Sequence, residues 1–227
     1  MKNIVPLLIL LFLFSCGNEK VLQLPEINHS EISEINDVSV AYLFYDETQP
    51  DSLELNRKNI INTTNWLINV DKRLKLKQVI PKISFLQKKK VSAGHQKEGV
   101  KNYFTCHDTT TKNPGFIEFT DITYHQNSVS EYLETASTSE KIKHAIQVNI
   151  NESQEITIIN SVLNSPTINT SKNNLIADLN RVDIKNGQIY LSFHENLLFQ
   201  EYITYKMLFD KVGFDKTTIS PEEFIFN

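Results

Sequence analysis

The feature that most limits what this chain can fold into is an apolar run at its N-terminus. Residues Ile4 to Phe14 are apolar apart from Pro6, and Lys2 places a positive charge before them. A helix of about 11 residues is about 16 Å long, roughly half the hydrocarbon core of about 30 Å, which disfavours a permanent transmembrane helix. A charge followed by a short apolar run is typical of a signal peptide, which contributes nothing to the mature fold.

The end of this run resembles the lipobox of bacterial lipoproteins. It reads Leu13-Phe14-Ser15-Cys16-Gly17, an aliphatic, a variable and a small residue before the cysteine. The resemblance implies that residues 1–15 are a cleaved lipoprotein signal peptide and that Cys16 is acylated. The alternative is an ordinary secretory peptide with an unrelated cysteine. Gly17 rather than Asp after the cysteine favours the outer membrane, by analogy with known sorting rules, so we expect a protein anchored in the cell envelope, on its periplasmic or surface side.

Composition places the rest of the chain among ordinary globular proteins. It is 22% charged and 40% hydrophobic with a formal net charge of -4, which gives no electrostatic reason to expect nucleic acid as a partner. There are two cysteines, and if Cys16 carries lipid then Cys106 has no intramolecular partner for a disulfide. The length after residue 15 suits one large domain or two small ones, and we expect two, at residues 38–139 and 140–227.

Residues 16–37 are polar and acidic without a sustained helical period. We interpret them as a lipid-anchored linker, either a spacer that lifts the protein from the membrane or a loosely packed N-terminal arm. The β-branched and aromatic run Val38 to Tyr45 predicts a buried strand. After a turn, Ser52 is predicted to cap a helix whose apolar positions continue to Val70.

A further helix is predicted from Leu74 to about Lys90, with a break at Pro81. Its last residues, Lys88 to Lys90, are all lysine. They could meet a phosphate or an acidic surface, but a solvated helix end favoured by the helix dipole is the better interpretation, and we assign them no function.

Cys106-His107-Asp108 is the segment that most resembles a catalytic motif. Cysteine beside histidine offers a nucleophile and a base, yet neighbours on a strand point to opposite faces and cannot make the activating hydrogen bond. A buried, inert Cys106 beside a surface His107 is therefore predicted. As a metal site the segment lacks a second spaced ligand pair. The other histidines are scattered, so neither a metal nor a cofactor is expected; they are His29, His95, His125, His144 and His194.

The second part of the chain has clearer patterns. Alternating residues around 151–153 predict a β-hairpin over 145–160, and a helix capped at Thr170 or Ser171 carries Leu175 to Val182. A strand at 188–193, an amphipathic helix at 197–212 and a last strand at 223–226 complete the order ββαβαβ. Tyr202, Tyr205 and Phe209 lie at helical spacing, which predicts that they belong to the core; a binding stripe is the alternative. The fold class is α+β, with mixed small sheets packed against amphipathic helices.

Residues 140–227 resemble the periplasmic domains of the biopolymer-transport ExbD/TolR proteins. The order of the hairpin, capped helix, strand, helix opened by an aromatic residue and last strand carries the resemblance, and Leu24-Pro25-Glu26 is similar to a segment of that family. It implies a dimerising envelope module that contacts a protein or peptidoglycan. The family's acidic transmembrane residue is missing from residues 1–16, so a proton-channel role is not expected.

Two functions are compatible with these patterns. The first is a non-enzymatic binding or scaffolding lipoprotein, attached to the membrane by its lipid, that associates with an envelope protein or with peptidoglycan, with a homodimer as one form. The second is an exported enzyme acting on a cell-wall or extracellular substrate, with Glu118 or Asp121 as acid or base. Lone carboxylates on a strand are common, so we favour the first function and predict no catalytic residue.

Overall fold

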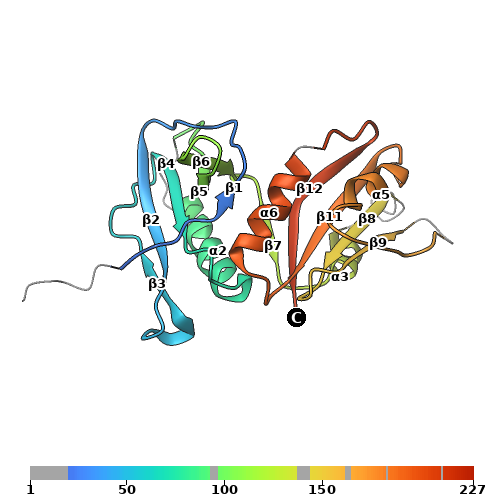
Figure 1. The fold of residues 1–227 in the computed structure, drawn as a ribbon, viewed down its shortest axis with the longest axis horizontal. Coiled ribbons are helices and arrows are strands. Elements are labelled where there is room, and N and C mark those ends of the chain that lie inside the picture. Colours follow the sequence, from blue (N-terminus) through green and yellow to red (C-terminus); the bar gives the residue numbers. More distant parts are fainter. Residues whose placement is uncertain (1–19, 93–96, 137–143, 162–164, 183, 211) are drawn as a thin grey trace, which may run out of the picture.

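The computed structural model describes residues 20–227 except 93–96, 137–143, 162–164, 183 and 211. The signal peptide and Cys16 therefore lie outside the described residues, as does His95. The fold is α+β, as predicted, and is built from two mixed six-stranded sheets with four α-helices in the described part (Figure 1). None of the described helices has the length and apolar character needed to cross a membrane.

The first sheet contains the N-terminal half of the chain. Its strands β2, β4 and β5 are parallel, β3 and β6 are antiparallel to their neighbours, and β1 runs parallel to the end of β5. The helix α2 (Leu76–Ser92) connects β4 to β5. The strands are β1 (Glu26–Ile27), β2 (Val38–Tyr45), β3 (Leu53–Asn56), β4 (Asn65–Val70), β5 (Asn102–Asp108) and β6 (Asn113–Glu118).

The second sheet contains the C-terminal half, in the order β10-β9-β8-β11-β12-β7. Strands β8, β11, β12 and β7 are parallel, and β9 and β10 are antiparallel to their neighbours. The strands are β7 (Thr123–His125), β8 (Ala145–Ile150), β9 (Ile156–Asn160), β10 (Ile168–Thr170), β11 (Gly187–His194) and β12 (Thr217–Phe226); the helices are α3 (Val129–Ala136), α5 (Leu175–Arg181) and α6 (Phe199–Asp210).

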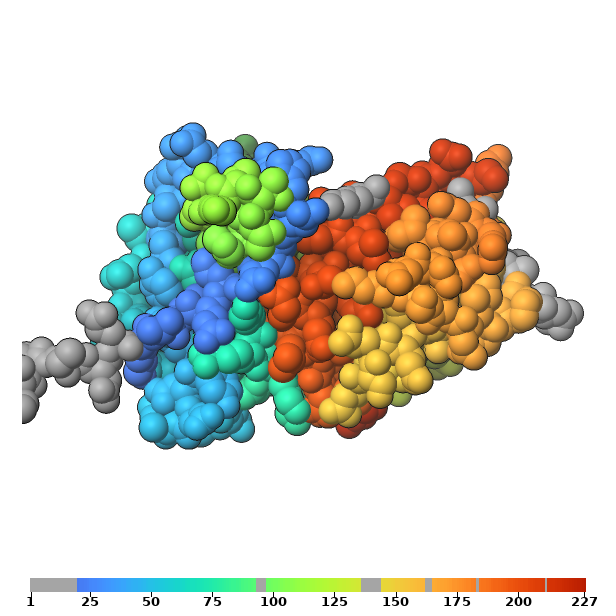
Figure 2. Space-filling model, in the orientation of Figure 1, coloured from blue at the N-terminus to red at the C-terminus, as the bar shows by residue number. Residues whose placement is uncertain are grey.

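The two halves repeat one topology. The order β3-β2-β4-β5 in the first sheet matches β9-β8-β11-β12 in the second, with the same strand directions. Each half also has a helix between its last two parallel strands, α2 in one and α6 in the other. Figure 2 shows the halves as two lobes that meet across the middle of the molecule.

The halves join through matched main-chain hydrogen bonds at the starts of α2 and α6. Leu76 N donates to Leu197 O at 2.9 Å, and Phe199 N donates to Leu74 O at 2.7 Å. Lys75 and Leu198 form the antiparallel bridge between these bonds. Each half donates a main-chain hydrogen bond to the other and accepts the equivalent bond in return, so the junction is isologous, like the interface of a two-fold dimer. The chain therefore contains a pseudo-dimer of its own two halves.

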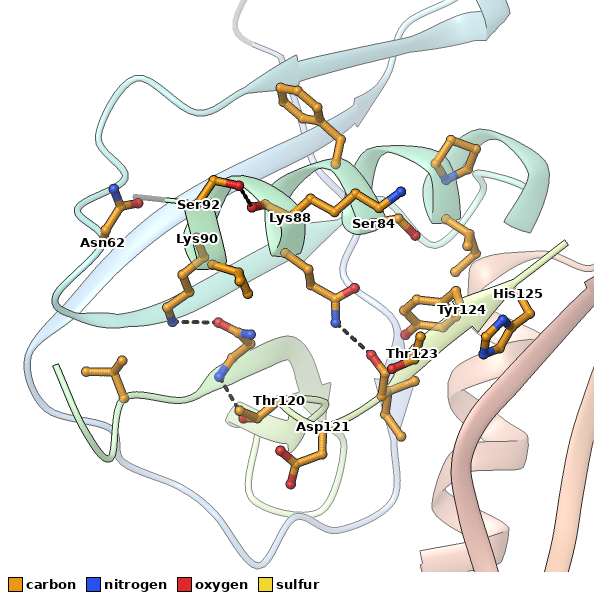
Figure 3. A pocket seen from close by; sticks show the side chains of 18 of the residues that line it. Asn62, Ser84, Lys88, Lys90, Ser92, Thr120, Asp121, Thr123, Tyr124 and His125 are labelled. Atoms are coloured by element: carbon orange, nitrogen blue, oxygen red, sulfur yellow. Dashed lines mark hydrogen bonds between the residues drawn. The ribbon is translucent and has the colours of Figure 1, made fainter. Parts of the chain in front are cut away.

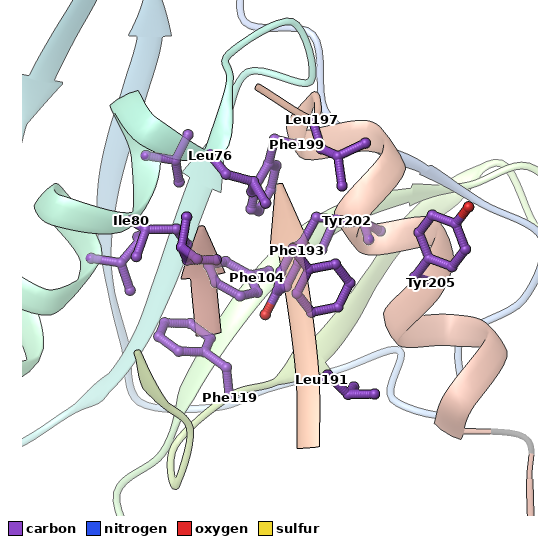
Figure 4. Packing of buried hydrophobic residues seen from close by; sticks show 14 of the residues in the cluster. Leu76, Ile80, Phe104, Phe119, Leu191, Phe193, Leu197, Phe199, Tyr202 and Tyr205 are labelled. Atoms are coloured by element: carbon purple, nitrogen blue, oxygen red, sulfur yellow. The ribbon is translucent and has the colours of Figure 1, made fainter. Parts of the chain in front are cut away.

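Aromatic side chains from both halves fill this junction (Figure 4). Phe104 of β5 stacks on Phe119 with ring centroids 3.9 Å apart, and it meets Phe199 of α6 edge-on at 5.1 Å. Tyr202 lies edge-on to Phe193 at 5.1 Å. Buried residues from both sheets form one continuous cluster, so the halves share a core and we expect them to unfold together. Tyr202, Tyr205 and Phe209 are buried, which confirms the prediction that they are core.

Several predicted elements differ from the structure. The helix predicted from Ser52 to Val70 is wrong, because this segment forms a short 3-10 turn followed by β3 and β4. In β4, Trp66, Ile68 and Val70 are buried and the residues between them are half-exposed. This is the two-residue period of a strand, which the helical interpretation overlooked.

The predicted break at Pro81 is also wrong, since α2 continues through it. Pro81 is exposed, so the helix carbonyl that its missing N–H leaves unpaired can be hydrated. Strand β7 pairs with β12 and so belongs to the second sheet, although it precedes residue 140 in the sequence. The two domains predicted at residues 38–139 and 140–227 stay a prediction. The hairpin, both helices and the strands predicted after residue 145 are confirmed, with β10 as an additional strand.

The N-terminal segment is a packed arm from Lys20 onward. Gln23 O accepts a hydrogen bond from Lys72 N at 2.8 Å, and β1 pairs with the end of β5. The side chain of Gln200 in α6 makes two hydrogen bonds with the main chain of Glu26. Glu26 N donates to Gln200 Oε1 at 2.8 Å, and Gln200 Nε2 donates to Glu26 O at 3.0 Å. Of the two interpretations of residues 16–37, the described part follows the arm rather than the free spacer.

Candidate binding groove beside α2

A continuous groove runs along one flank of α2, opposite the segment 119–128 that crosses from the first sheet to the second. It consists of two adjoining cavities of about 1050 and 440 Å³, which share Ile80, Pro81 and Gln126. Figure 3 shows the larger cavity, with α2 on one side and residues Thr120 to His125 on the other. We call this feature the α2 groove.

Lys90 forms part of the base of the α2 groove. It is only 7% exposed, because it lies on the same helix face as the buried Ile83 and Leu86. Its ammonium donates to Asn102 Oδ1 at 2.7 Å and lies 4.7 Å from the centroid of the Trp66 ring. Burial lowers the pKa of Lys90 to about 8. The predicted solvated lysine run is therefore correct for the exposed Lys88 and Lys89 but wrong for Lys90.

The opposite wall is fixed to both helices. Gln87 of α2 donates to Ile122 O at 2.8 Å, and the hydroxyl groups of Tyr124 and Tyr202 are 3.1 Å apart. Tyr202 in turn donates to Glu223 at 2.8 Å. Burial raises the pKa of both tyrosines well above the ordinary value, so they stay protonated near neutral pH.

A buried ion pair supports this wall from beneath. Glu223 is fully buried in β12, and it accepts hydrogen bonds from Tyr202 and from the ammonium of Lys206. A buried carboxylate needs such partners to offset the loss of hydration. On the neighbouring position of β12, Glu222 pairs with His125, whose ring stacks on Phe224 at 5.0 Å. These contacts place the end of the α2 groove on the second half of the chain.

The exposed part of the groove is amphipathic. Phe85 is 47% exposed and Val91 70% exposed, and both line it together with the exposed carboxylate of Asp121. Asn102 and Thr120 of the opposite wall hydrogen-bond to each other, with 3.0 Å between Asn102 N and Thr120 Oγ1. Such a surface offers apolar contact area and a rim of charges to an extended ligand.

The Cys106-His107-Asp108 segment lies outside the groove. Cys106 is fully buried, and burial raises the pKa of its thiol well above the ordinary value, while His107 is exposed; the predicted burial of Cys106 is confirmed. The carboxylate of Asp108 accepts from Ser30 N at 3.1 Å and Thr110 N at 2.8 Å, which gives it a structural role in the turn after β5.

Of the two carboxylates considered for catalysis, only Asp121 lies in the groove. Glu118 is held by Lys101 at 2.7 Å and by Thr120 at 3.0 Å. In the part of the chain that the structure describes, no group of three His, Cys, Asp or Glu residues is arranged to hold a metal ion.

Sequence reasoning missed the α2 groove because its walls come from segments far apart in the chain. The usable signal was the position of Lys90, which shares a helical face with Ile83 and Leu86 and was therefore predictable as buried. Comparisons of the chain with family models, curated proteins and solved structures found no match.

Proposed function

We propose that this protein is a lipid-anchored, non-enzymatic binding module of the cell envelope that holds part of another envelope component in its α2 groove. The observation that carries the proposal is the make-up of the groove. Its polar base is occupied by internal hydrogen bonds, such as Lys90 with Asn102, while its rim exposes Phe85 and Val91. A surface of this kind gains affinity from apolar contact rather than from reacting groups.

The lipobox-like segment at Cys16 supports the envelope location, and acylation there would supply the anchor. The repeated topology supports the part of the proposal that comes from the ExbD/TolR resemblance. That family's module dimerises, and here two similar halves meet through an isologous junction within one chain. A protein segment and a peptidoglycan strand are both extended ligands that suit a long groove.

An exported enzyme remains the second candidate because of one observation. A lysine with a pKa of about 8 beside a cavity is the kind of group that catalytic sites contain. The ammonium of Lys90 is, however, engaged by Asn102 and covers the Trp66 ring. Turnover of a cell-wall or exported substrate that is lost in Lys90→Met and kept in Lys89→Met would favour the enzyme.

The test of the binding proposal is crosslinking in intact cells from defined positions. A photoreactive amino acid replaces Val91 or Asp121 on the two walls of the α2 groove, or Ile159 on β9 of the second sheet as a matched exposed control. We expect one envelope protein or peptidoglycan fragment to be captured from both walls and not from position 159. The same capture should be lost in a Cys16→Ala variant.

The products should be detected with an antiserum rather than a C-terminal tag, because Asn227 lines the smaller cavity of the groove. Equal capture from all three positions, or none from the two walls, would contradict the proposal.

A further inference from the structure

Positive charge in this protein is concentrated in one segment of the sequence. Residues 57–92 contain ten Lys or Arg and a single acidic residue, Asp71, although the whole chain has a net charge of -4. Asp71 is fully buried and forms a two-bond ion pair with Arg73. The helix α2 itself carries five lysines and no acidic residue. Lys72 pairs with Glu26 and Lys90 is buried, so the positive charge that this segment presents at the surface comes mainly from Arg57 and from the segment's other lysines.

The structure gathers part of this charge on one face, formed by the flank of α2 that points away from the groove and by the neighbouring β3 edge. A cavity of about 470 Å³ on this face is lined by Arg57, Lys58 and Lys89. Lys82 is exposed on α2 seven residues before Lys89, which is about two helical turns and places both on the same side of the helix. We call this surface the basic face.

Exposed and half-buried apolar side chains lie within the same region. Phe85 is 47% exposed on α2 at the border between the basic face and the α2 groove, which it also lines, and the guanidinium of Arg57 lies 5.2 Å from the centroid of its ring. Ile60, in the loop after β3, is half-buried and lines the same cavity as Arg57, Lys58 and Lys89. Lysine and arginine around exposed aromatic and aliphatic residues is the pattern of surfaces that rest in the headgroup layer of a membrane.

The first described residue of the chain, Lys20, lies beside this face. Lys20 pairs with Asp46 at 2.7 Å and with Glu54 of β3, and Glu54 lines the same 470 Å³ cavity as Arg57 and Lys89. Cys16 precedes Lys20 by four residues, which reach at most about 14 Å even when fully extended. A lipid on Cys16 would hold the β3 side of the protein within that distance of the bilayer.

We propose that the basic face docks on the anionic phospholipid headgroups of the membrane that holds the anchor. The inference rests on the proposed acylation of Cys16 and adds the orientation of the protein to it. The lipid supplies attachment, while the charges and Phe85 select one orientation, as expected when an acyl anchor is combined with a polybasic patch. Phe85 lies on the rim that the basic face shares with the α2 groove, so in this orientation the groove opens along the membrane surface.

The test compares the acetylation rates of individual lysines by mass spectrometry. The purified protein is placed in vesicles of phosphatidylcholine alone or with about 30% phosphatidylglycerol. We expect acetylation of Lys58, Lys82 and Lys89 to slow at least about fivefold on the anionic vesicles. Lysines of the second half should react at the same rate on both; these internal controls are Lys172, Lys185 and Lys216. About 0.5 M salt should remove the protection, because it shortens the range of electrostatic attraction.

A charge-matched pair of variants separates docking from net charge. Replacing Lys58 and Lys89 with Gln should remove the protection that anionic vesicles give to Lys82, which is exposed on the same side of α2. The same replacement of Lys172 and Lys185 should leave that protection in place. Equal acetylation of the basic face on both vesicles would overturn the proposal. Protection in intact cells but not on vesicles would also overturn it, by assigning the face to an acidic protein.

The intact mass of the purified protein reports acylation of Cys16 separately, so failure of the anchor and failure of the docking face are distinguishable. If Cys16 proves to be unmodified, its thiol can be coupled to a maleimide phospholipid in the same vesicles. Cys106 is fully buried and does not compete for the reagent. The acetylation rates then test the basic face with an anchor supplied at the same position.

Discussion

Replacing Lys90 with Met should change how the stability of the protein depends on pH. Burial lowers the pKa of Lys90 from 10.5 to about 8, so the folded protein releases this proton at a lower pH than the unfolded chain does. Between these two values the unfolded state binds more protons, and the free energy of unfolding must rise with pH across that window. Below about pH 8 the full penalty for burying the charge is present.

The magnitude follows from the difference between the two pKa values. At 1.36 kcal/mol per pH unit, the complete effect is about 3.4 kcal/mol. At pH 10 an unfolded lysine is still about three-quarters protonated, so about 2.5 kcal/mol is realised between pH 7 and pH 10. Contact with the Trp66 ring favours the charged form by about 1 kcal/mol. We therefore expect Lys90 to add about 1.5 kcal/mol to the wild-type free energy of unfolding over this interval.

The assay is urea denaturation of the wild type, Lys90→Met and Lys89→Met at pH 7 and pH 10. Lys89 is exposed on the same helical turn, so its variant should follow the wild type. The hydrogen bond that Asn102 loses in Lys90→Met costs the same at both pH values and cancels in the comparison. If Lys90→Met and the wild type change equally between pH 7 and pH 10, the buried-charge reasoning is refuted.

The other predictions concern the junction, the buried ion pair and the buried thiol. Phe199→Ala should lower the free energy of unfolding by about 3 to 5 kcal/mol, because it leaves a cavity in the shared core; tryptophan fluorescence and circular dichroism should give one coincident transition, and two separate transitions would show that the halves fold independently. Glu223→Gln should cost about 3 to 5 kcal/mol in urea denaturation because it leaves the ammonium of Lys206 without its buried partner, whereas Glu222→Gln, at a partly exposed site, should cost under about 1 kcal/mol. Cys106 should react with a thiol reagent at pH 8 only after denaturation, and rapid labelling of the folded protein would show that the thiol is accessible.

The second half of the chain was predictable because its elements have clear boundaries. The turn at 151–153 and Gly187 separate segments whose apolar residues follow one period each, so the order of strands and helices could be read directly. In the first half, the segment after Ser52 contains apolar residues at both helical and strand spacings. Packing against β2 and β5 decided between them, and that contact is not visible in the sequence.

The repeat and the groove escaped sequence analysis for a different reason. Equivalent positions of the two halves carry different residues. Leu76 and Phe199 occupy matching places at the starts of α2 and α6. Phe104 of β5 pairs with β4 where Glu223 of β12 pairs with β11. What the halves share is strand order and register, which many sequences can encode. The α2 groove depends on the crossing segment at 119–128, whose place beside α2 is set by tertiary contacts such as that of Gln87 with Ile122.

The isologous junction also determines how the protein can vary. In a homodimer, every substitution appears on both sides of the two-fold axis, so a change that improves one groove also alters its copy. Here the two halves have different sequences and differ in structure: Gln200 of α6 hydrogen-bonds to Glu26 of the N-terminal arm, whereas one flank of α2 lines an open groove. One side can thus hold the assembly together while the other specialises, and each chain should bind a single ligand where a symmetric dimer would bind two.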